Sequence, residues 1–347
     1  MDRQDIAPRI GFCCTFISPT GDAEQQRRLN MRHATLASLT RIAAAAAAER
    51  LSEIVAHNLD ALDGQLAFVA SQPPAERMFR ILSNFLPGWS HPATMPIYRD
   101  AGLHAEIARR LAAAGEYARR EAIRLSMHPG PHAVLATARD ETLANAARDI
   151  AEHVEMMEML GYGGGWHPHG AHINIHGGSG KLGIDGIRRG LAALPAAARN
   201  LLTLENDEMS FGLDDLLPLA DEIALVVDFH HHWIRSAGEY LELEDPRLDR
   251  VKASWRGIRP AAHISVSRET LCAHWPAADA PDYGALSATG LKATALRGHS
   301  DMMWNLAVND LVARHLSWCD VEVEAKSKNL ASAQLAAHVR DRAGGIA

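Results

Sequence analysis

Eight short apolar segments alternate with helical segments along this chain, and this alternation constrains the fold more than any other feature. Segments that are apolar throughout are typical of strands buried on both faces of a parallel sheet. The strands are predicted at 9–16, 78–82, 122–127, 171–175, 201–204, 223–227, 261–266 and 320–325. Helices are predicted at 35–68, 101–118, 140–160, 184–197 and 301–313, with a partly helical segment at 241–253 and a polar helical tail. Eight such units in 347 residues predict an α/β fold, a (β/α)8 barrel of the TIM type, with residues 1–347 as a single domain.

Several of the predicted strands end in groups that bind metals. The segment 201–204 closes on Glu205, and 223–227 closes on Asp228, with His231 three residues further on. Side chains at the carboxyl ends of parallel strands leave the packed layer and converge above it, at the edge where α/β proteins carry out chemistry. The metal-binding groups at or after the strand ends give the candidate set His91, His128, His176, Glu205, Asp228, His231, His263, His299 and Glu324.

The chain contains 19 histidines, and many of them fall where strands end. Nine ionisable groups at one face of a barrel would be costly to bury without a metal or a substrate. Imidazole and carboxylate ligands without thiolate favour Mn, Fe or Zn, and nine groups can hold two or three ions. A cluster of this kind suits phosphodiester hydrolysis. The same ligands could equally polarise a sugar carbonyl or bind oxygen, so ligand chemistry alone leaves the reaction open.

The remaining composition argues against other classes of protein. A net charge of −7 argues against non-specific nucleic-acid binding by the whole surface, although a local basic groove is compatible with it. No apolar run is long enough to span a membrane, and the first residues lack the pattern of a secretory signal. The four cysteines have no metal-finger spacing. Reduced thiols and a cytoplasmic location are therefore expected, with no membrane partner.

A family resemblance adds to this interpretation. The motifs that carry it run in the family's order from about residue 10 to residue 328: LN at 29–30, FRILS at 79–83, SHP at 90–92, RLSMHPG at 124–130, LENDE at 204–208, VDFHHHW at 227–233, WRGIRPAAHIS at 255–265, GHSD at 298–301 and VEAKSK at 323–328. The sequence resembles the ultraviolet damage endonucleases. The resemblance implies a TIM-type barrel with about three Mn ions and an enzyme that nicks DNA on the 5′ side of ultraviolet photoproducts. Its implied ligands are the nine residues obtained from the strand ends, with Glu205, Asp228, His263 and Glu324 as the central catalytic ones.

The chain departs from the family pattern at positions that face the substrate or complete the metal site. Family members usually carry a Gln-Tyr pair that wedges into the duplex, and Pro131 and His132 stand in its place. The family's lysine two residues before the seventh-strand histidine is replaced by Ala261, and a Tyr and an Asn after the first strand by Phe12 and Phe16. The resemblance thus implies a retained metal scaffold with altered substrate contacts at Pro131 and His132.

Other segments are candidates for contact with a substrate. Arg256 and Arg259 precede the seventh strand and are the best candidates for a backbone phosphate contact, and Lys326 follows Glu324, where it could neutralise a phosphate. The segment 273–298 has no clear period and is predicted as a long loop near the barrel mouth. The Gly- and His-rich turn around Trp166 is also expected over the mouth.

The first hypothesis is a divalent-metal-dependent hydrolase of the endonuclease type, which uses metal-activated water to nick damaged double-stranded DNA 5′ to photolesions and works with two or three Mn²⁺ ions, with Fe or Zn as alternatives. A second keeps the barrel and the metals but assigns a sugar, a peptide or a small metabolite as substrate, for an isomerase, hydrolase or oxidase. A third is a metal-storing or partner-binding barrel without catalysis.

Overall fold

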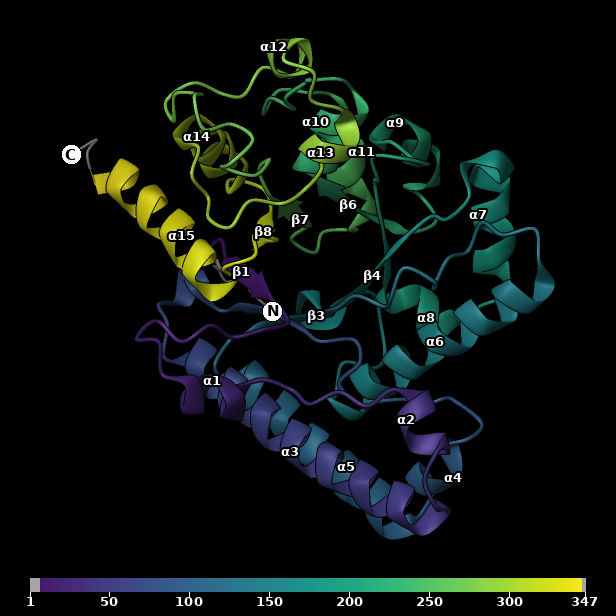
Figure 1. Ribbon diagram of the computed structural model, residues 1–347. Helices are drawn as coiled ribbons and strands as arrows, with labels where there is room; N and C mark the ends of the chain where they lie inside the picture. The colour runs from purple at the N-terminus through teal and green to yellow at the C-terminus, as the bar shows by residue number, and fades with distance from the viewer. Residues whose placement is uncertain (1–6, 345–347) are drawn as a thin grey trace.

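Figure 1 shows the computed structural model, which describes residues 7–344. Its eight strands are all parallel, pair in chain order and close into a barrel where β8 pairs with β1. The strands are β1 (Ile10–Cys13), β2 (Met78–Ile81), β3 (Arg124–Met127), β4 (His172–His176), β5 (Leu202–Glu205), β6 (Ala224–Asp228), β7 (Ala261–Ile264) and β8 (Asp320–Val323). The predicted (β/α)8 barrel is confirmed.

One or more helices follow every strand. The α-helices are α1 (Ala23–Leu29), α2 (Leu36–Thr40), α3 (Ala44–Ala70), α4 (Met95–Tyr98), α5 (Ala101–Arg120), α6 (Asp140–Met159), α7 (Gly183–Ala192), α8 (Ala196–Leu201), α9 (Leu213–Leu216), α10 (Phe229–Arg235), α11 (Arg247–Ser254), α12 (Tyr283–Ala288), α13 (Ala293–Leu296), α14 (Leu306–His315) and α15 (Asn329–Gly344). Short 3₁₀ segments are η1 (Pro74–Glu76), η2 (Pro168–Gly170), η3 (Gly180–Leu182) and η4 (Leu217–Leu219). Within residues 7–344, no helix is both long and apolar enough to cross a membrane.

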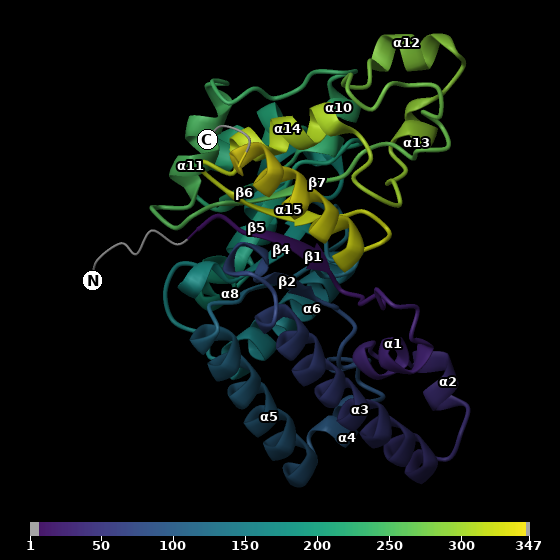
Figure 2. The same ribbon diagram turned by 90° about the vertical axis from the view of Figure 1, so that its left-hand side faces the viewer.

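The long helices α3 and α5 lie side by side on one flank of the barrel, and α15 packs against β1 and α14 on another (Figures 1 and 2). The sequence of α5 explains its place. Asp100 caps the helix by accepting hydrogen bonds from the first-turn amides, and Ile107, Leu111 and Ala114 recur at helical spacing on its buried face. An amphipathic helix of this kind covers the barrel with one face and exposes the other.

The structure shifts several predicted boundaries. The predicted helix 35–68 is split into α2 and α3, and 184–197 is split near Pro195, which precedes α8 and cannot continue a helix with a full hydrogen-bond ladder. The predicted helix 301–313 begins only at Leu306, where Asn305 caps it. The segment 273–298 contains α12 and α13, so its lack of a clear period concealed two short helices.

The amino-terminal end of the barrel is held by one acid and three arginines. Asp320 begins β8 and is fully buried. Its Oδ2 lies 2.9 Å from Nη1 of Arg124 and 3.3 Å from Nη1 of Arg9, and its Oδ1 lies 2.8 Å from Nε of Arg259. Because Arg124 and Asp320 both begin strands, this cluster marks the end opposite the candidate site. Arg259, expected to contact a substrate phosphate, is instead engaged in holding this end together.

The turn around Trp166 lies at the same amino-terminal end, and its expected place over the barrel mouth is wrong. The His167 ring packs on Trp255, with ring centroids 4.8 Å apart. The guanidinium carbon of Arg256 lies 3.6 Å from the centre of the Trp166 ring, a cation–π contact. A segment that precedes a parallel strand must lie at the end where strands begin. For the same reason Arg256, before β7, does not reach the carboxyl-terminal face.

Candidate metal centre

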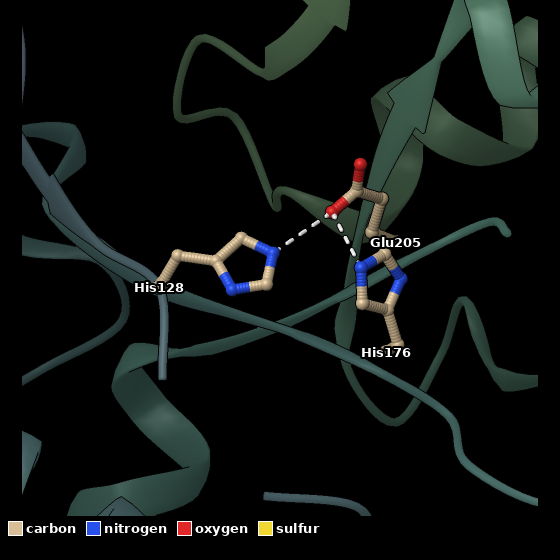
Figure 3. A group of neighbouring side chains, drawn as sticks. All are labelled: His128, His176 and Glu205. Atoms are coloured by element: carbon tan, nitrogen blue, oxygen red, sulfur yellow. Dashed lines mark hydrogen bonds and ion pairs between the residues drawn. The ribbon is translucent and has the colours of Figure 1, made fainter. Parts of the chain in front are cut away.

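Glu205 is the hub of a cluster of histidines at the carboxyl-terminal end of the strands. It is the last residue of β5 and is 1% exposed. Figure 3 shows His128 and His176 approaching the same carboxylate oxygen from two sides. Its Oε2 lies 3.3 Å from Nε2 of His128 and 3.9 Å from Nε2 of His176. The side-chain amide of Asn174 donates a hydrogen bond to this oxygen, which fixes the carboxylate's orientation.

The other carboxylate oxygen faces β6 and β7. Oε1 of Glu205 lies 3.0 Å from Nδ1 of His263 and 3.5 Å from Nδ1 of His231. Asp228 ends β6 and caps α10, since its Oδ1 accepts the backbone N–H of His231 at 2.6 Å. Its Oδ2 is buried without a hydrogen-bond partner and lies 3.8 Å from Nδ1 of His231. A buried carboxylate oxygen without a donor is costly unless a cation serves it.

Glu324 extends the cluster on the β8 side. Its Oε1 lies 3.3 Å from Nδ1 of His263 and 2.6 Å from Nη1 of Arg80. Its Oε2 lies 3.9 Å from Nδ1 of His299, whose Nδ1 also lies 2.8 Å from the Glu324 backbone oxygen. Arg80 is buried, and within residues 7–344 it is the one arginine that contacts this cluster.

Two groups of three side chains could each hold a divalent ion. One is His128, His176 and Glu205, and the other is Glu205, Asp228 and His263; in each group the ligand atoms lie within 4.8 Å of one another. Glu205 belongs to both groups, so its two oxygens could bridge two ions. The nitrogen and oxygen donors, together with the unpartnered Asp228 oxygen, fit a borderline or hard divalent cation.

The electrostatics of the cluster without a metal match its composition. Burial opposes ionisation of Glu205, but His263 and His176 outweigh it and hold the pKa of its carboxyl well below the usual range. Burial also opposes the charge on His231, yet Asp228, Glu205 and Glu324 together raise its pKa to about 9. The same carboxylates at Glu205 and Glu324 raise the pKa of His263 well above its ordinary value despite full burial. The carboxylates therefore attract positive charge, which protons supply in the absence of a metal.

Eight of the nine predicted ligands join this network. They are His128, His176, Glu205, Asp228, His231, His263, His299 and Glu324. His91 does not join it: it is exposed, and its Nδ1 accepts the backbone N–H of Ala93. Whether His91 binds a metal stays a prediction.

The predicted substrate residues on the carboxyl-terminal side are exposed. Pro131 and His132 lie on the loop after His128, and Nε2 of His132 is 3.3 Å from Oδ2 of Asp149. Lys326 forms an exposed ion pair with Asp301 at 3.1 Å. By contrast, Phe12 and Phe16, which replace the family's Tyr and Asn, are buried in the core, where both pack on Phe68.

Sequence reasoning missed four polar residues of the cluster. Asn174 and Glu322 lie two positions before the strand-end ligands His176 and Glu324, so the alternation of a strand could have placed them on the same inward face. Glu208 lies 3.8 Å from Nε2 of His231. The fourth is Arg80, one residue before the end of β2, where no strand-end ligand two positions later gives the same signal.

The profile of the family described as "UV-endonuclease UvdE" matches residues 8–344. A "UV-damage endonuclease" of Neurospora crassa is 32% identical over 204 residues, which cover 54% of this chain and 30% of that protein. A "UV DNA damage endonuclease" of Nostoc sp. is 26% identical over 338 residues, 96% of this chain and 91% of that one. The crystal structure of SacUVDE matches with a TM-score of 0.71 at 21% identity, over 96% of this chain and 98% of that chain, which supports the fold.

The lengths of the relatives differ from that of this chain. The alignments span 30% to 57% of the length of several curated relatives that it matches. The family match nevertheless extends over almost all of the sequence. The family resemblance inferred from the motifs is therefore confirmed.

Proposed function

Since this chain belongs to the UV-endonuclease UvdE family, we propose that it is a divalent-metal-dependent endonuclease that nicks damaged double-stranded DNA on the 5′ side of ultraviolet photolesions. The observation that carries the proposal is the buried Glu205 carboxylate, which lies within 3.9 Å of ring nitrogens from four histidines and belongs to both groups of potential ligands. The relatives are named as UV-damage endonucleases. Nothing in the comparisons supports the alternative of a small-molecule or peptide substrate.

The metal ligands proposed are the eight residues joined in the network. Two or three ions, Mn²⁺ with Fe or Zn as alternatives, would activate a water and neutralise charge on a phosphate oxygen. Asn174 orients Glu205 through its amide, and Asn206 holds the strand end of Asp228 by exchanging two hydrogen bonds of 2.9 Å with its backbone. Catalysis at this site would depend on such preorganisation, because an ion cluster works only when its ligands keep their geometry.

The exposure of the ligands gives the direction of approach for DNA. Glu205, Asp228 and His263 are at most 1% exposed, so they form the floor of the centre. The side chains of the outer histidines are more open, with exposures of 12% to 29% at His128, His176, His231 and His299. A phosphate would therefore reach the centre from the histidine side, where water can also enter.

Contacts with DNA outside the metal centre are proposed at the exposed positions beside it. Pro131 and His132 lie three and four residues after His128, and the His132 side chain is 73% exposed. Lys326 follows Glu324 and is 47% exposed at its side chain, so its ammonium is free to exchange Asp301 for a DNA phosphate. Arg256 and Arg259 have no part in this proposal, since their contacts are at the other end of the barrel.

The proposal is tested with purified protein, Mn²⁺ and ultraviolet-irradiated supercoiled plasmid, with undamaged plasmid in parallel. Wild-type protein should nick irradiated plasmid selectively. Glu205→Ala should lose at least about a hundredfold in rate, because several kcal/mol of transition-state stabilisation depend on the metal centre. Glu242→Ala, which removes an exposed carboxylate paired with Arg314, serves as the matched control and should retain full activity. If metal-loaded wild-type protein nicked both plasmids at the same rate, or nicked neither, the result would contradict the proposal.

A further inference from the structure

Glu322 is a buried carboxylate beneath the candidate metal centre. It lies two residues before Glu324 on β8 and is fully buried. Its Oε1 accepts a hydrogen bond from the Ser126 hydroxyl, and its Oε2 lies 3.3 Å from Nε2 of His263 and 3.6 Å from Nη1 of Arg80. A buried carboxylate is retained only where such partners offset the loss of water. Glu322 therefore has a defined set of partners, one of which is a predicted metal ligand.

His263 is held between Glu322 and the candidate metal centre. Its Nδ1 faces Oε1 of Glu205 at 3.0 Å and Oε1 of Glu324 at 3.3 Å. Its Nε2 is on the opposite side of the ring, 3.3 Å from Oε2 of Glu322, and forms no hydrogen bond to any other group within residues 7–344; the contact with Glu322 is at ion-pair distance and is not a formed hydrogen bond. The ring is 0% exposed, so it has no contact with bulk water.

A histidine ring binds a metal through one nitrogen while the other donates its hydrogen to an acceptor, and that acceptor decides which nitrogen is free. Within residues 7–344, the carboxylate that lies beside Nε2 of this ring is that of Glu322, at 3.3 Å. A hydrogen on Nε2 leaves the lone pair of Nδ1 directed toward Glu205 and Glu324. Glu322 also shares Arg80 with Glu324, so the charge of this arginine is divided between the two carboxylates.

We propose that Glu322 is a positioning residue, which keeps the ring hydrogen of His263 on Nε2 and so directs Nδ1 at the metal centre. This inference rests on the metal centre of the proposed function, but not on DNA as the substrate. Glu322 does not belong to either group of potential metal ligands. It acts on the ion through His263.

The test is Mn²⁺ binding to the full chain after removal of metal with EDTA, measured by titration calorimetry and by the electron paramagnetic resonance spectrum of bound Mn²⁺. Glu322→Leu removes the acceptor and should weaken Mn²⁺ binding about 100-fold, at the upper end for residues that orient a ligand. Glu322→Gln keeps an oxygen acceptor without the charge, so it should recover part of the affinity and lose only about 10-fold. The spectrum of bound Mn²⁺ should change with Glu322→Leu, because His263 would no longer be held in place as a ligand. A merely structural defect would lower the stability of the protein without altering the ligand field.

Asp310→Asn is the matched control. It alters a histidine–carboxylate contact elsewhere, between Oδ1 of Asp310 and Nε2 of His338 at 2.6 Å, and should leave Mn²⁺ binding unchanged. Should Glu322→Leu fail to fold, Glu322→Gln decides alone. Wild-type affinity and spectrum in the folded variants would overturn the inference and leave the endonuclease proposal intact. The wild type could bind Mn²⁺ but nick no DNA; weakened Mn²⁺ binding in the Glu322 variants would then support the inference, while the endonuclease proposal would be refuted. A wild type that binds no Mn²⁺ would overturn both.

Discussion

Metal binding should release protons, because two of the proposed ligands carry them when no metal is present. Burial disfavours the charged form of His231, but Asp228, Glu205 and Glu324 outweigh it and raise its pKa to about 9. The pKa of His263 is also raised well above its ordinary value, by Glu205 and Glu324 against full burial. A metal binds the neutral imidazole, so each of these rings must lose a proton to become a ligand. Filling the centre at pH 7 should therefore release about two protons.

The size of the effect follows from the shifted pKa of His231. At pH 7 a group with a pKa of about 9 is deprotonated in about 1% of molecules, so its proton weakens the apparent metal affinity about 100-fold, or ~2.7 kcal/mol. Raising the pH from 7 to 9 should recover about 50-fold from this group alone. Loss of the proton from His263 adds to that change.

The assay is calorimetric titration of Mn²⁺ under anaerobic conditions, in two buffers that differ in ionisation enthalpy. The difference in observed heat gives the number of protons released, and a series from pH 7 to pH 9 gives the affinity slope. His338→Ala, outside the cluster, should release as many protons as the wild type. Tight Mn²⁺ binding with no proton release and no dependence on pH would refute the argument, since it would mean that the carboxylates do not hold these rings charged.

Three further predictions concern stability. The folded pKa of His231, about 9, lies above its unfolded value, so its charge stabilises the metal-free protein fully below about pH 6.5 and the contribution, about 3 kcal/mol, is lost as the pH rises through 9; thermal unfolding in EDTA that is flat over this range would contradict it. Replacing Asp320 by Asn should cost about 3–5 kcal/mol in urea unfolding, because three arginines lose their common partner, while Mn²⁺ affinity stays unchanged. Gly115→Ala should cost about 3 kcal/mol, since its Cβ would lie 1.7 Å from the backbone oxygen of Leu160, whereas Gly64→Ala meets only a flexible side chain and should cost less than about 1 kcal/mol; equal melting temperatures would show that the helices can move apart.

The sequence was most informative where an apolar run ends abruptly in a charged residue. Glu205 and Asp228 are the last residues of β5 and β6, so the end of the apolar pattern located both the strands and their ligands. The direction of each strand carries equal information. Arg259 precedes β7 and lies with Asp320 at the opposite end, which follows from parallel strand order once the strand start is known. Position before or after a strand is therefore a better guide to a site than proximity in sequence.

Other features depend on packing that no local pattern contains. His91 is in the loop between β2 and α4, and its exposure results from how that loop folds rather than from the strand that precedes it. Arg80 lies inside the short strand β2 between Phe79 and Ile81, where a charged side chain resembles an outward-facing one. Only closure of the barrel shows that it points inward and lies 3.6 Å from Glu322. Pairing across the barrel is a property of the tertiary fold.

The two ends of the barrel differ in the balance of their buried charges, and this difference favours cations at the carboxyl-terminal end. At the amino-terminal end three arginines share one carboxylate, Asp320. At the other end Glu205, Asp228 and Glu322 are buried with Glu324 beside them, and Arg80 is the one arginine in contact with this group within residues 7–344. The remaining charge must be met by protonated histidines or by bound cations. Divalent ions and protons would therefore compete for the same carboxylates, since the field that raises the pKa values of His231 and His263 is the field that would hold the metal.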